Sequence, residues 1–470
     1  MGGMGQEELI LGIDIGTTSV KVGILNAKVG RIIARQSKDT QANVPSELGC
    51  EGNKQNPPKI MSAMHACISR LSKDLLKQVS AIGICGQMHG VMLWNYTEDD
   101  CPWEKAANES RYDILSDKVS SLYTWQDSRC DPDFLASLPQ PKSHLKACSG
   151  YGCNTLFWIS KNRPEKLKTF NCAGTIQDFA VAMLCELKKP VMSVQNAASW
   201  GYFDTNSAEW NTEILDSAGF PVELLPKVVP SGEIAGRLTE TWHSIPAGTP
   251  VVAALGDLQC SVLSALKNDD DAVLNISTSA QMSFIAPSFD PNNIDDSTFV
   301  EFLPYFEGRY LAVAAALNGG NVLATFISML QKWTLELGSH LPQSTLWEKV
   351  IESASKCETT SLVVKPKILG ERHSPKEFGS VININAGNVS LGQVFKATCT
   401  GVINNLHEIM PRDMLLHNNI SRILGVGSAL SRNKVLQEEV KRCYQLPIVF
   451  EGKGDAAFGA AMVASKIAKS

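Results

Sequence analysis

The residues with the clearest chemical potential lie near the start of the chain, in LILGIDIGTTSVKVGIL. Residues 9–15 are almost wholly apolar, which predicts a strand buried on both faces, and Asp14 lies inside it. A carboxylate in such a strand needs a partner. Gly16, Thr17 and Thr18 then predict a tight turn whose N–H groups and threonine hydroxyls bind phosphate oxygens, with Asp14 facing a phosphate-bound Mg²⁺. A capped hairpin turn with an incidental aspartate is the alternative.

A second carboxylate, Asp257, lies where a predicted strand meets a predicted helix. Residues 250–255 (PVVAAL) predict a buried strand, and Gly256-Asp257 opens the helix. Two roles are open at this junction: Asp257 caps the helix, or it accepts a proton from an alcohol. Because the helix dipole favours a carboxylate there, we expect Asp257 to stay ionised and available as a base.

Two further polar segments follow predicted strands. Residues 87–90 (QMHG) follow the short apolar run 81–86, and residues 123–129 (YTWQDSR) crowd aromatic and hydrogen-bonding side chains together. Open α/β sheets bind their ligands at strand ends, so ligand contacts are expected in both segments. A structural ion pair between Asp127 and Arg129 is the alternative for the second segment.

The order of the elements indicates two similar halves. Strand and helix signals alternate along 470 residues, which predicts an α/β protein with two domains. Residues 272–279 (AVLNISTS) repeat the pattern of the first stretch, an apolar strand and a hydroxyl-rich turn. We therefore predict an N-terminal domain, 1–266, and a C-terminal domain, 267–470. Residues 40–58 predict a surface loop, and a helix is expected over about 59–76.

Composition and cysteine pattern favour a cytoplasmic globular protein, and the charge does not indicate a nucleic-acid or membrane partner. Hydrophobic residues are 44% and charged residues 19% of the chain, and the net charge of −5 offers no general attraction to nucleic acid or anionic membranes. No apolar window is long enough to span a bilayer, and the N-terminus has no secretory signal. The 13 cysteines form no CxxC pair, which indicates reduced thiols. Oligomeric state cannot be read from the sequence.

The common nucleotide motifs are absent from the sequence. No GxxxxGK[ST] occurs, which excludes a P-loop, and there is no protein-kinase catalytic loop. Residues 423–429 (ILGVGSA) form a strand and glycine turn without the third glycine of a dinucleotide-binding fingerprint.

Seven segments, in order along nearly the whole chain, resemble the FGGY family of carbohydrate kinases. That family has two ribonuclease-H-like domains of the actin/hexokinase/Hsp70 ATPase type around a central cleft, and the resemblance implies the same α/β fold here. The segments are IDIGTTSVKVGIL, GQMHG, SWGYFDTNSAEWN, PVVAALGDLQCSVLSA, ISTSA, GERHSP and GVGSALSRN.

The resemblance implies transfer of phosphate from ATP to a sugar, with Mg²⁺. Thr17, Thr18 and Thr278 would hold the phosphates from the two halves, and Asp14 would orient Mg²⁺ and so take part in catalysis. The adenosine and ribose pocket would be lined by residues that leave room for the nucleotide: Gly320, Gly427 and Ser428.

On the sugar side, the resemblance implies that Met88 and His89 hold the substrate, with His89 as a hydrogen-bond partner of a hydroxyl. Asp257 would contact the sugar, orient the attacking hydroxyl and accept its proton as the catalytic base. Asp127 is a further predicted substrate contact.

Within the family, the pattern is most similar to kinases of a seven-carbon ketose. Kinases of a five-carbon ketose share the Met-His-Gly of the GQMHG loop, and they or a polyol kinase are the alternative. Two positions depart from the family pattern. Thr155 stands where a lysine usually precedes the tryptophan by three residues, and Ser428 replaces the second glycine of Gly-Gly-Ala.

Two competing classes are a nucleotide-switch ATPase without a sugar acceptor and an inactive sugar-binding relative. The GQMHG loop and Asp257 argue against the first, because a switch ATPase needs neither. The presence of Asp14, Thr17 and Asp257 together argues against the second.

Overall fold

The first predicted strand lies inside the main sheet of an N-terminal lobe. In the computed structural model this strand is β1 (Leu9–Ile15), followed by the antiparallel strands β2 (Ser19–Asn26) and β3 (Arg31–Asp39). β6 (Val79–Gly86) pairs with β1 in parallel. The sheet has seven strands in the order β16-β17-β6-β1-β2-β3, with β18 also on β6. The structure describes residues 8–106, 111–293, 298–372, 374, 376–450 and 454–468.

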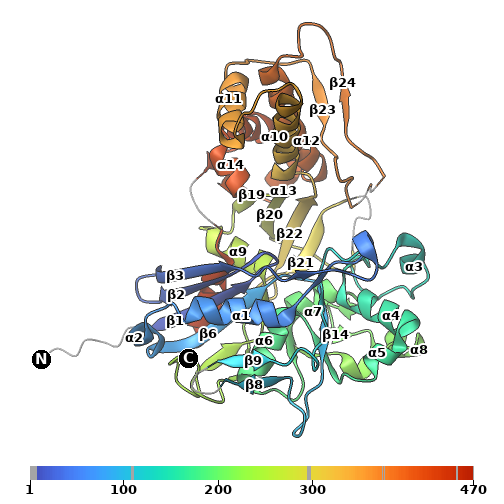
Figure 1. Cartoon of the computed structure of the whole chain (residues 1–470), viewed down its shortest axis with the longest axis vertical. Coiled ribbons are helices and arrows are strands. Elements are labelled where there is room, and N and C mark those ends of the chain that lie inside the picture. Colours follow the sequence, from blue (N-terminus) through green and yellow to red (C-terminus); the bar gives the residue numbers. More distant parts are fainter. Residues whose placement is uncertain are drawn as a thin grey trace, which may run out of the picture.

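Helices cover both faces of this sheet, which is why every residue of β1 is buried. Helix α1 (Pro57–Ile68) packs on one face. The last helix of the chain, α16 (Ala456–Ala468), packs on the other, against β1 and β6 (Figure 1). A Cβ atom at Gly12 would lie 1.9 Å from the carbonyl oxygen of Ala457, so this close approach requires glycine.

The C-terminal lobe repeats the same sheet pattern above the N-terminal one (Figure 1). β19 (Asp271–Ile276) pairs antiparallel with β20 (Ala280–Ala286), which pairs with β22 (Tyr310–Ala316). β25 (Arg422–Val426) pairs with β19 in parallel, as β6 does with β1. The order is β21-β22-β20-β19-β25-β26. The predicted two similar units are therefore present. The division at residue 266 stays a prediction, and the last helix crosses back to the N-terminal lobe.

Three details differ from the sequence predictions. The expected loop 40–58 contains the short strands β4 (Asn43–Val44) and β5 (Lys54–Gln55), because Ala42 and Gln55 are buried there. The helix expected over 59–76 divides into α1 and α2 (Lys73–Leu76), with Leu71 buried between them. The strand expected over 250–255 divides into β17 and β18, since the chain bulges between two registers on β6.

The remaining elements complete the two lobes, and no described helix is long and apolar enough to cross a membrane. In the N-terminal lobe they are η1 (Gly49–Glu51), β7 (Met92–Trp94), β8 (Trp103–Lys105), β9 (Tyr112–Ile114), β10 (Leu122–Tyr123), α3 (Pro132–Ala136), α4 (Gly152–Asn162), α5 (Pro164–Leu167), β11 (Cys172–Gly174), α6 (Ile176–Cys185), β12 (Val191–Ser193), α7 (Val194–Trp200), β13 (Phe203–Asp204), β14 (Glu209–Trp210), α8 (Thr212–Ser217), η2 (Val222–Leu224), β15 (Lys227–Val229), β16 (Ile234–Arg237), β17 (Pro250–Val252), β18 (Leu255–Gly256) and α9 (Asp257–Ala265). In the C-terminal lobe they are β21 (Glu301–Pro304), α10 (Gly320–Glu336), α11 (Gln343–Ser355), β23 (Val363–Lys365), β24 (Ser380–Ile382), α12 (Leu391–Ile409), α13 (Arg412–His417), α14 (Ser428–Arg432), α15 (Lys434–Tyr444) and β26 (Ile448–Val449).

Candidate active site

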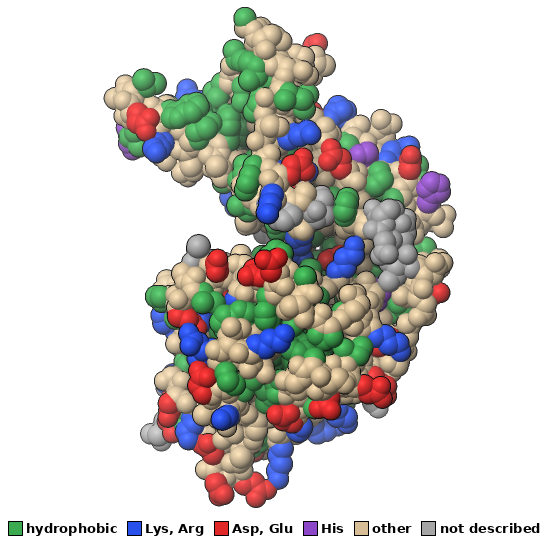
Figure 2. Space-filling model, turned by 90° about the vertical axis from the view of Figure 1, so that its right-hand side faces the viewer, with side chains coloured by type: hydrophobic (Ala, Val, Ile, Leu, Met, Phe, Trp, Pro, Cys, Tyr) green, Lys and Arg blue, Asp and Glu red, His purple; other side chains and the backbone are tan. Residues whose placement is uncertain are grey.

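A cleft lies between the two lobes, visible as a hollow in Figure 2. A cavity of about 890 Å³ is lined by Asp14 and Asp257 from the N-terminal lobe and by Gly427 and Ser428 from the C-terminal lobe. A second cavity of about 1420 Å³ in the C-terminal lobe is lined by Thr278 and Gly320, and the two share Ser277, Ser428 and Arg432. Most of the residues predicted for nucleotide and chemistry therefore line these two adjoining cavities. The linings do not include Thr17 and Thr18, or the predicted sugar contacts Met88, His89 and Asp127.

Asp14 has the partner that its buried position requires. It lies directly opposite Lys21 in the β1–β2 pairing, and Lys21 Nζ lies 3.3 Å from Asp14 Oδ2. Burial raises the pKa of Asp14, while the positive charge of Lys21 opposes that shift. Lys21 was not among the predicted site residues, although the hairpin register identifies it. A turn over residues 16–19 places residues 14 and 21 on the same face.

Asp14 also fits a hard divalent cation. Its Oδ1 atom is buried and has no hydrogen-bond partner, although a carboxylate oxygen normally accepts at least one. Within the described residues, no group of three or more His, Cys, Asp or Glu side chains is placed to hold a metal. A Mg²⁺ here would therefore take oxygens from nucleotide phosphates and water as well as from Asp14, which suits its preference for few protein ligands.

Asp257 is the first residue of helix α9 and does not cap it. The N-cap is Gly256, and Asp257 Oδ1 accepts the N–H of Leu258 at 2.8 Å. Burial and the nearby charge of Asp14 raise the pKa of Asp257 to about 7. The expectation that the helix dipole keeps Asp257 fully ionised is wrong, because desolvation and the second carboxylate outweigh the dipole. A carboxyl with a pKa near 7 is still suited to general base catalysis.

The two turns that are predicted to bind phosphate are each closed by a backbone hydrogen bond, but the N-terminal turn is one residue longer. In the N-terminal turn the Gly16 N–H donates to Ser19 O at 3.1 Å, and in the C-terminal turn the Ser277 N–H donates to Ser279 O at 3.0 Å. Thr278 is exposed at the tip of its turn, as Thr18 is. The Thr17 hydroxyl accepts from Trp125 Nε1 at 3.0 Å and faces Gln87 Oε1 at 3.4 Å, so part of its bonding capacity is used within the protein.

The two glycines that were predicted to line the adenosine and ribose pocket line these cavities, and close contacts within the protein also require them. A Cβ atom at Gly320 would lie 2.0 Å from the carbonyl oxygen of Ser277, and one at Gly427 would lie 2.4 Å from that of Ile276. Gly427 also has φ of 99°, which favours glycine. The protein's own backbone therefore excludes side chains at both glycines, and a collision with the nucleotide stays a prediction.

The loop predicted to hold the sugar packs His89 against α7 and Tyr151, and it brings Met88 next to the residue before Asp257. His89 Nδ1 lies 2.9 Å from the carbonyl oxygen of Ser199, and the ring stacks on Tyr151 at 4.6 Å. Burial, together with the positive charge of Arg372, lowers the pKa of His89 to about 4, so the ring is neutral near pH 7. Because Nδ1 must carry the proton donated to the carbonyl, Nε2 is an acceptor. Met88 lies next to Gly256, whose Cβ would be 2.9 Å from its sulfur.

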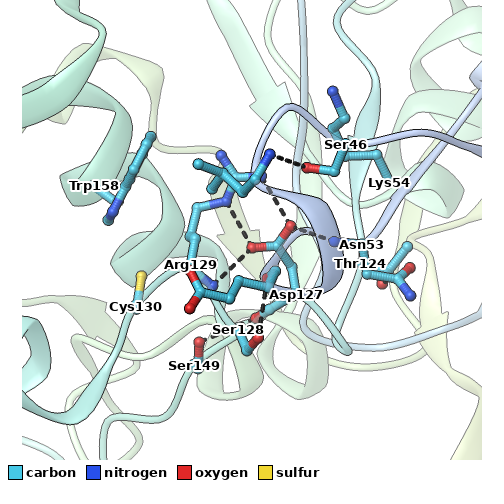
Figure 3. A network of polar contacts seen from close by, with 12 residues as sticks. Ser46, Asn53, Lys54, Thr124, Asp127, Ser128, Arg129, Cys130, Ser149 and Trp158 are labelled. Carbon is cyan, nitrogen blue, oxygen red and sulfur yellow. Dashed lines mark hydrogen bonds and ion pairs between the residues drawn. The ribbon is translucent and has the colours of Figure 1, made fainter.

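Asp127 forms the ion pair that was the alternative to a substrate contact (Figure 3). Its carboxylate accepts from Arg129 Nε at 2.6 Å and Nη2 at 2.8 Å, and also from the backbone N–H of Asn53 at 2.8 Å. Both side chains are buried, and the guanidinium stacks over the ring of Tyr123. A sugar contact by Asp127 stays a prediction. Arg129 and Asn53 already donate hydrogen bonds to both oxygens of its carboxylate.

Other site residues could not have been found from local patterns. Tyr151 comes from helix α4, and Trp125 from the segment after β10, and only the fold brings them to His89 and Thr17. In the GERHSP segment, buried Glu371 accepts from the backbone N–H of Leu317 at 2.8 Å and from the side chain of Asn318 at 2.7 Å. His373 and Pro375 of that segment lie outside the described residues.

Comparison with known proteins decides the family. Residues 9–264 match the model of the FGGY family of carbohydrate kinases, N-terminal domain. The chain belongs to this family. It is 47% identical to human sedoheptulokinase over 98% of both chains. A xylulose kinase from Rhodospirillum rubrum has the same fold, with a TM-score of 0.80, 17% identity and coverage of 97% of this chain and 89% of that one.

Family membership settles the fold class and the kind of enzyme. An ADP-bound glycerol kinase from Plasmodium falciparum also shares the fold, with a TM-score of 0.78, 17% identity and coverage of 98% and 90% of the two chains. The two-domain α/β architecture predicted from the sequence is therefore confirmed. This FGGY chain is a sugar kinase, which decides against the competing class of nucleotide-switch ATPase.

Proposed function

We propose that this kinase transfers the γ-phosphate of ATP to the terminal hydroxyl of sedoheptulose, giving sedoheptulose 7-phosphate and ADP, with Mg²⁺ as cofactor. The observation that carries the substrate is the 47% identity to human sedoheptulokinase over 98% of both chains. The alternative substrate is D-xylulose, or another ketose or polyol. We place the reaction in the cytoplasm, in keeping with the free thiols of the described cysteines.

The transfer requires an activated sugar hydroxyl, and Asp257 would activate it by accepting its proton. As the sugar oxygen attacks the γ-phosphorus, its proton passes to the Asp257 carboxylate, the bond from phosphorus to the bridging oxygen breaks, and ADP leaves. A base whose pKa is about 7 is deprotonated in a large share of molecules at neutral pH and is still basic enough to take the proton.

Charge on the phosphates would be balanced from the β1–β2 hairpin. Bound Mg²⁺ neutralises charge on the phosphate oxygens, and Asp14 would hold it through the Oδ1 atom that has no other partner. The Lys21 ammonium is partly exposed, lines the cleft and would meet the same phosphates. Thr18 and Thr278 would approach them from the two lobes.

The sugar would lie against His89 and Met88, next to Asp257. The neutral Nε2 of His89 would accept a hydrogen bond from a sugar hydroxyl, and Tyr151 holds the ring in place by stacking. Closure of the lobes over both substrates would exclude water, which otherwise competes with the sugar as acceptor.

The test is ADP production with Mg²⁺, ATP and a panel of ketoses and polyols. The proposal expects the highest kcat/KM with sedoheptulose and no turnover without added Mg²⁺. A higher kcat/KM for D-xylulose would move the substrate to the alternative. ADP production that does not depend on any added sugar would contradict the proposed reaction.

A further inference from the structure

A buried pair of glutamine side chains lies behind the phosphate turn. Gln55, on β5, is 1% exposed, and Gln87, directly after β6, is 2% exposed. Gln87 Nε2 donates to Gln55 Oε1 at 3.0 Å, and Gln55 Nε2 donates to the Thr17 carbonyl oxygen at 2.7 Å. The Thr17 hydroxyl closes the ring by donating to Gln87 Oε1 at 3.4 Å. Three segments far apart in the sequence are thus joined in one cycle.

On the nucleotide side, this cycle sets the direction of the turn's peptide groups. The N–H and C=O of a trans peptide point in opposite directions. With the Thr17 carbonyl held by Gln55, the N–H of Thr18 is turned away from Gln55. The Thr18 carbonyl is held in the same way by the backbone N–H of Thr40 at 2.9 Å. The hydrogen bonds to these two carbonyls therefore fix the direction of the turn's N–H groups, which would meet phosphate oxygens.

On the sugar side, the same cycle grips the residue that precedes Met88 and His89. The Gln87 N–H donates to the Ile15 carbonyl oxygen at 3.0 Å, and the Gln87 carbonyl accepts from Gln177 Nε2 at 3.1 Å. Gln87 therefore has both its backbone and its side chain fixed. The side-chain amide of Gln87 is therefore the link between this loop and the Thr17 turn.

The side-chain amide of Gln55 cannot rotate without losing hydrogen bonds. Gln55 uses its second hydrogen toward Asn43 Oδ1 at 3.0 Å, so rotating its amide would break three hydrogen bonds in a buried place. Gln55 lines neither of the two cavities of the cleft. It can therefore influence the reaction only through the residues that it holds.

We infer that Gln55 is a positioning residue that couples the sugar loop to the phosphate turn, so that sugar and nucleotide bind cooperatively. This inference rests on the proposed function, because it takes the loop with His89 as the sugar site and the turn with Thr17 as the phosphate site. With the cycle intact, the ligand that orders one segment leaves the other already ordered for the second ligand.

The test is a linkage measurement on Gln55→Met, which keeps length and removes the amide. The dissociation constant of sedoheptulose is measured by calorimetry with and without a non-hydrolysable ATP analogue. We expect the analogue to tighten sugar binding about tenfold in the wild type and less than about twofold in the variant. A kcat about tenfold lower should accompany it, from loss of the oriented turn. A purely structural role would lower the melting temperature and leave the coupling factor unchanged.

Two further variants separate the contributions. Asn43→Ala removes the other bond of the Gln55 amide without touching Thr17 or Gln87, and it should keep the wild-type coupling. Gln55→Glu keeps the acceptor for Gln87 but loses the donor to Thr17, and it should behave as Gln55→Met does. Wild-type coupling in Gln55→Met overturns the inference alone. A wild type that consumes ATP with no sugar overturns the proposed function, and the inference with it.

Discussion

The two turns that are predicted to bind phosphate join equivalent antiparallel strands of the two lobes, but the residue pairs behind the turns differ. In the N-terminal hairpin, Asp14 lies opposite Lys21, one pair before the turn. At the matching place in the C-terminal hairpin, Asn275 lies opposite Gln281, and both pairs line the same cavity. The same architecture therefore carries two charges in one lobe and two neutral amides in the other. The charged pair of the hairpin is therefore in the N-terminal lobe, although the C-terminal lobe also brings Arg432 to the same cavity.

The turns are also held from behind in different ways. Each turn has a carbonyl held by a backbone N–H at 2.9 Å, that of Thr18 by Thr40 and that of Thr278 by Asn321 at the start of α10. The N-terminal turn is also held by the side chain of Gln55, which donates to the Thr17 carbonyl. A backbone bond to a long helix fixes a turn regardless of ligands. A side-chain network that also reaches the sugar loop can respond to the second substrate. The difference between the turns is therefore the side-chain network of Gln55 and Gln87, which the N-terminal turn has in addition to its backbone support.

The largest effect is expected when the proposed base in the N-terminal lobe, Asp257, is replaced. Asp257→Asn should lower kcat by roughly 10²–10⁴-fold, the usual share of a general base. The asparagine keeps the shape and can still accept the Leu258 N–H, so the melting temperature should not fall. Steady-state kinetics and thermal unfolding of this one variant check both points. A variant that retains most of its kcat would sink the proposed mechanism.

The charge difference between the lobes can be erased directly. Asp14→Asn with Lys21→Gln gives the N-terminal hairpin the amide pair of the C-terminal one. We expect kcat to fall by roughly 10²-fold, because the Mg²⁺ ligand and the facing cation are lost together. Activity should be measured over a Mg²⁺ titration, where the half-saturating concentration should rise.

The matched control exchanges the two neutral amides at the equivalent place in the C-terminal hairpin. Asn275→Gln with Gln281→Asn changes side-chain length at the equivalent place without adding charge. It should change kcat less than about fivefold. Equal losses in the two double variants would contradict the assignment of charge chemistry to one lobe.

The pH profile tests the environment of Asp257. With its pKa near 7, kcat/KM should fall about tenfold for each pH unit below 7, as the base is protonated. The sign for stability is opposite to that of an ordinary salt-bridged carboxylate. The folded state binds this proton more tightly than the unfolded state, so this carboxyl lowers stability as pH rises from about 4 to about 7. Asp257→Asn should remove that slope in a pH series of unfolding curves.

The two threonines of the N-terminal turn should differ. Thr17→Val removes a hydroxyl that accepts from Trp125, and we expect a loss of about 1–3 kcal/mol divided between ATP binding and folding. Thr18→Val removes an exposed hydroxyl and should affect only KM for ATP. Measuring KM for ATP and the melting temperature of both variants distinguishes Thr17, whose hydroxyl is hydrogen-bonded within the protein, from the exposed Thr18. Unchanged ATP kinetics in both would show that the turn is only structural.

Local sequence could predict the two hairpins, because a strand and its turn lie within one short segment of the chain. The run around Asp14 specified β1, the turn and the returning strand, and the echo at 272–279 identified the second hairpin. What could not be predicted comes from packing. The raised pKa of Asp257 depends on burial and on Asp14, 243 positions away in the chain. The stacking of His89 on Tyr151 and the Gln55–Gln87 pair likewise join segments that carry no mutual signal.

The smallest effect is expected where the chain departs from the family pattern in the C-terminal lobe. Ser428 is exposed at the first position of α14, and its side chain follows Gly427, whose backbone already fills the close contact with Ile276. Ser428→Gly therefore changes neither the turn nor a buried bond, and KM for ATP should change less than about threefold with kcat retained. Gly427→Ala is the contrasting variant, because its Cβ would collide with the Ile276 carbonyl at 2.4 Å, and it should lose stability as well as ATP binding. If Ser428→Gly alters KM as strongly as Gly427→Ala does, then the serine hydroxyl contacts the nucleotide, and the C-terminal lobe is a more active partner than its neutral turn suggests.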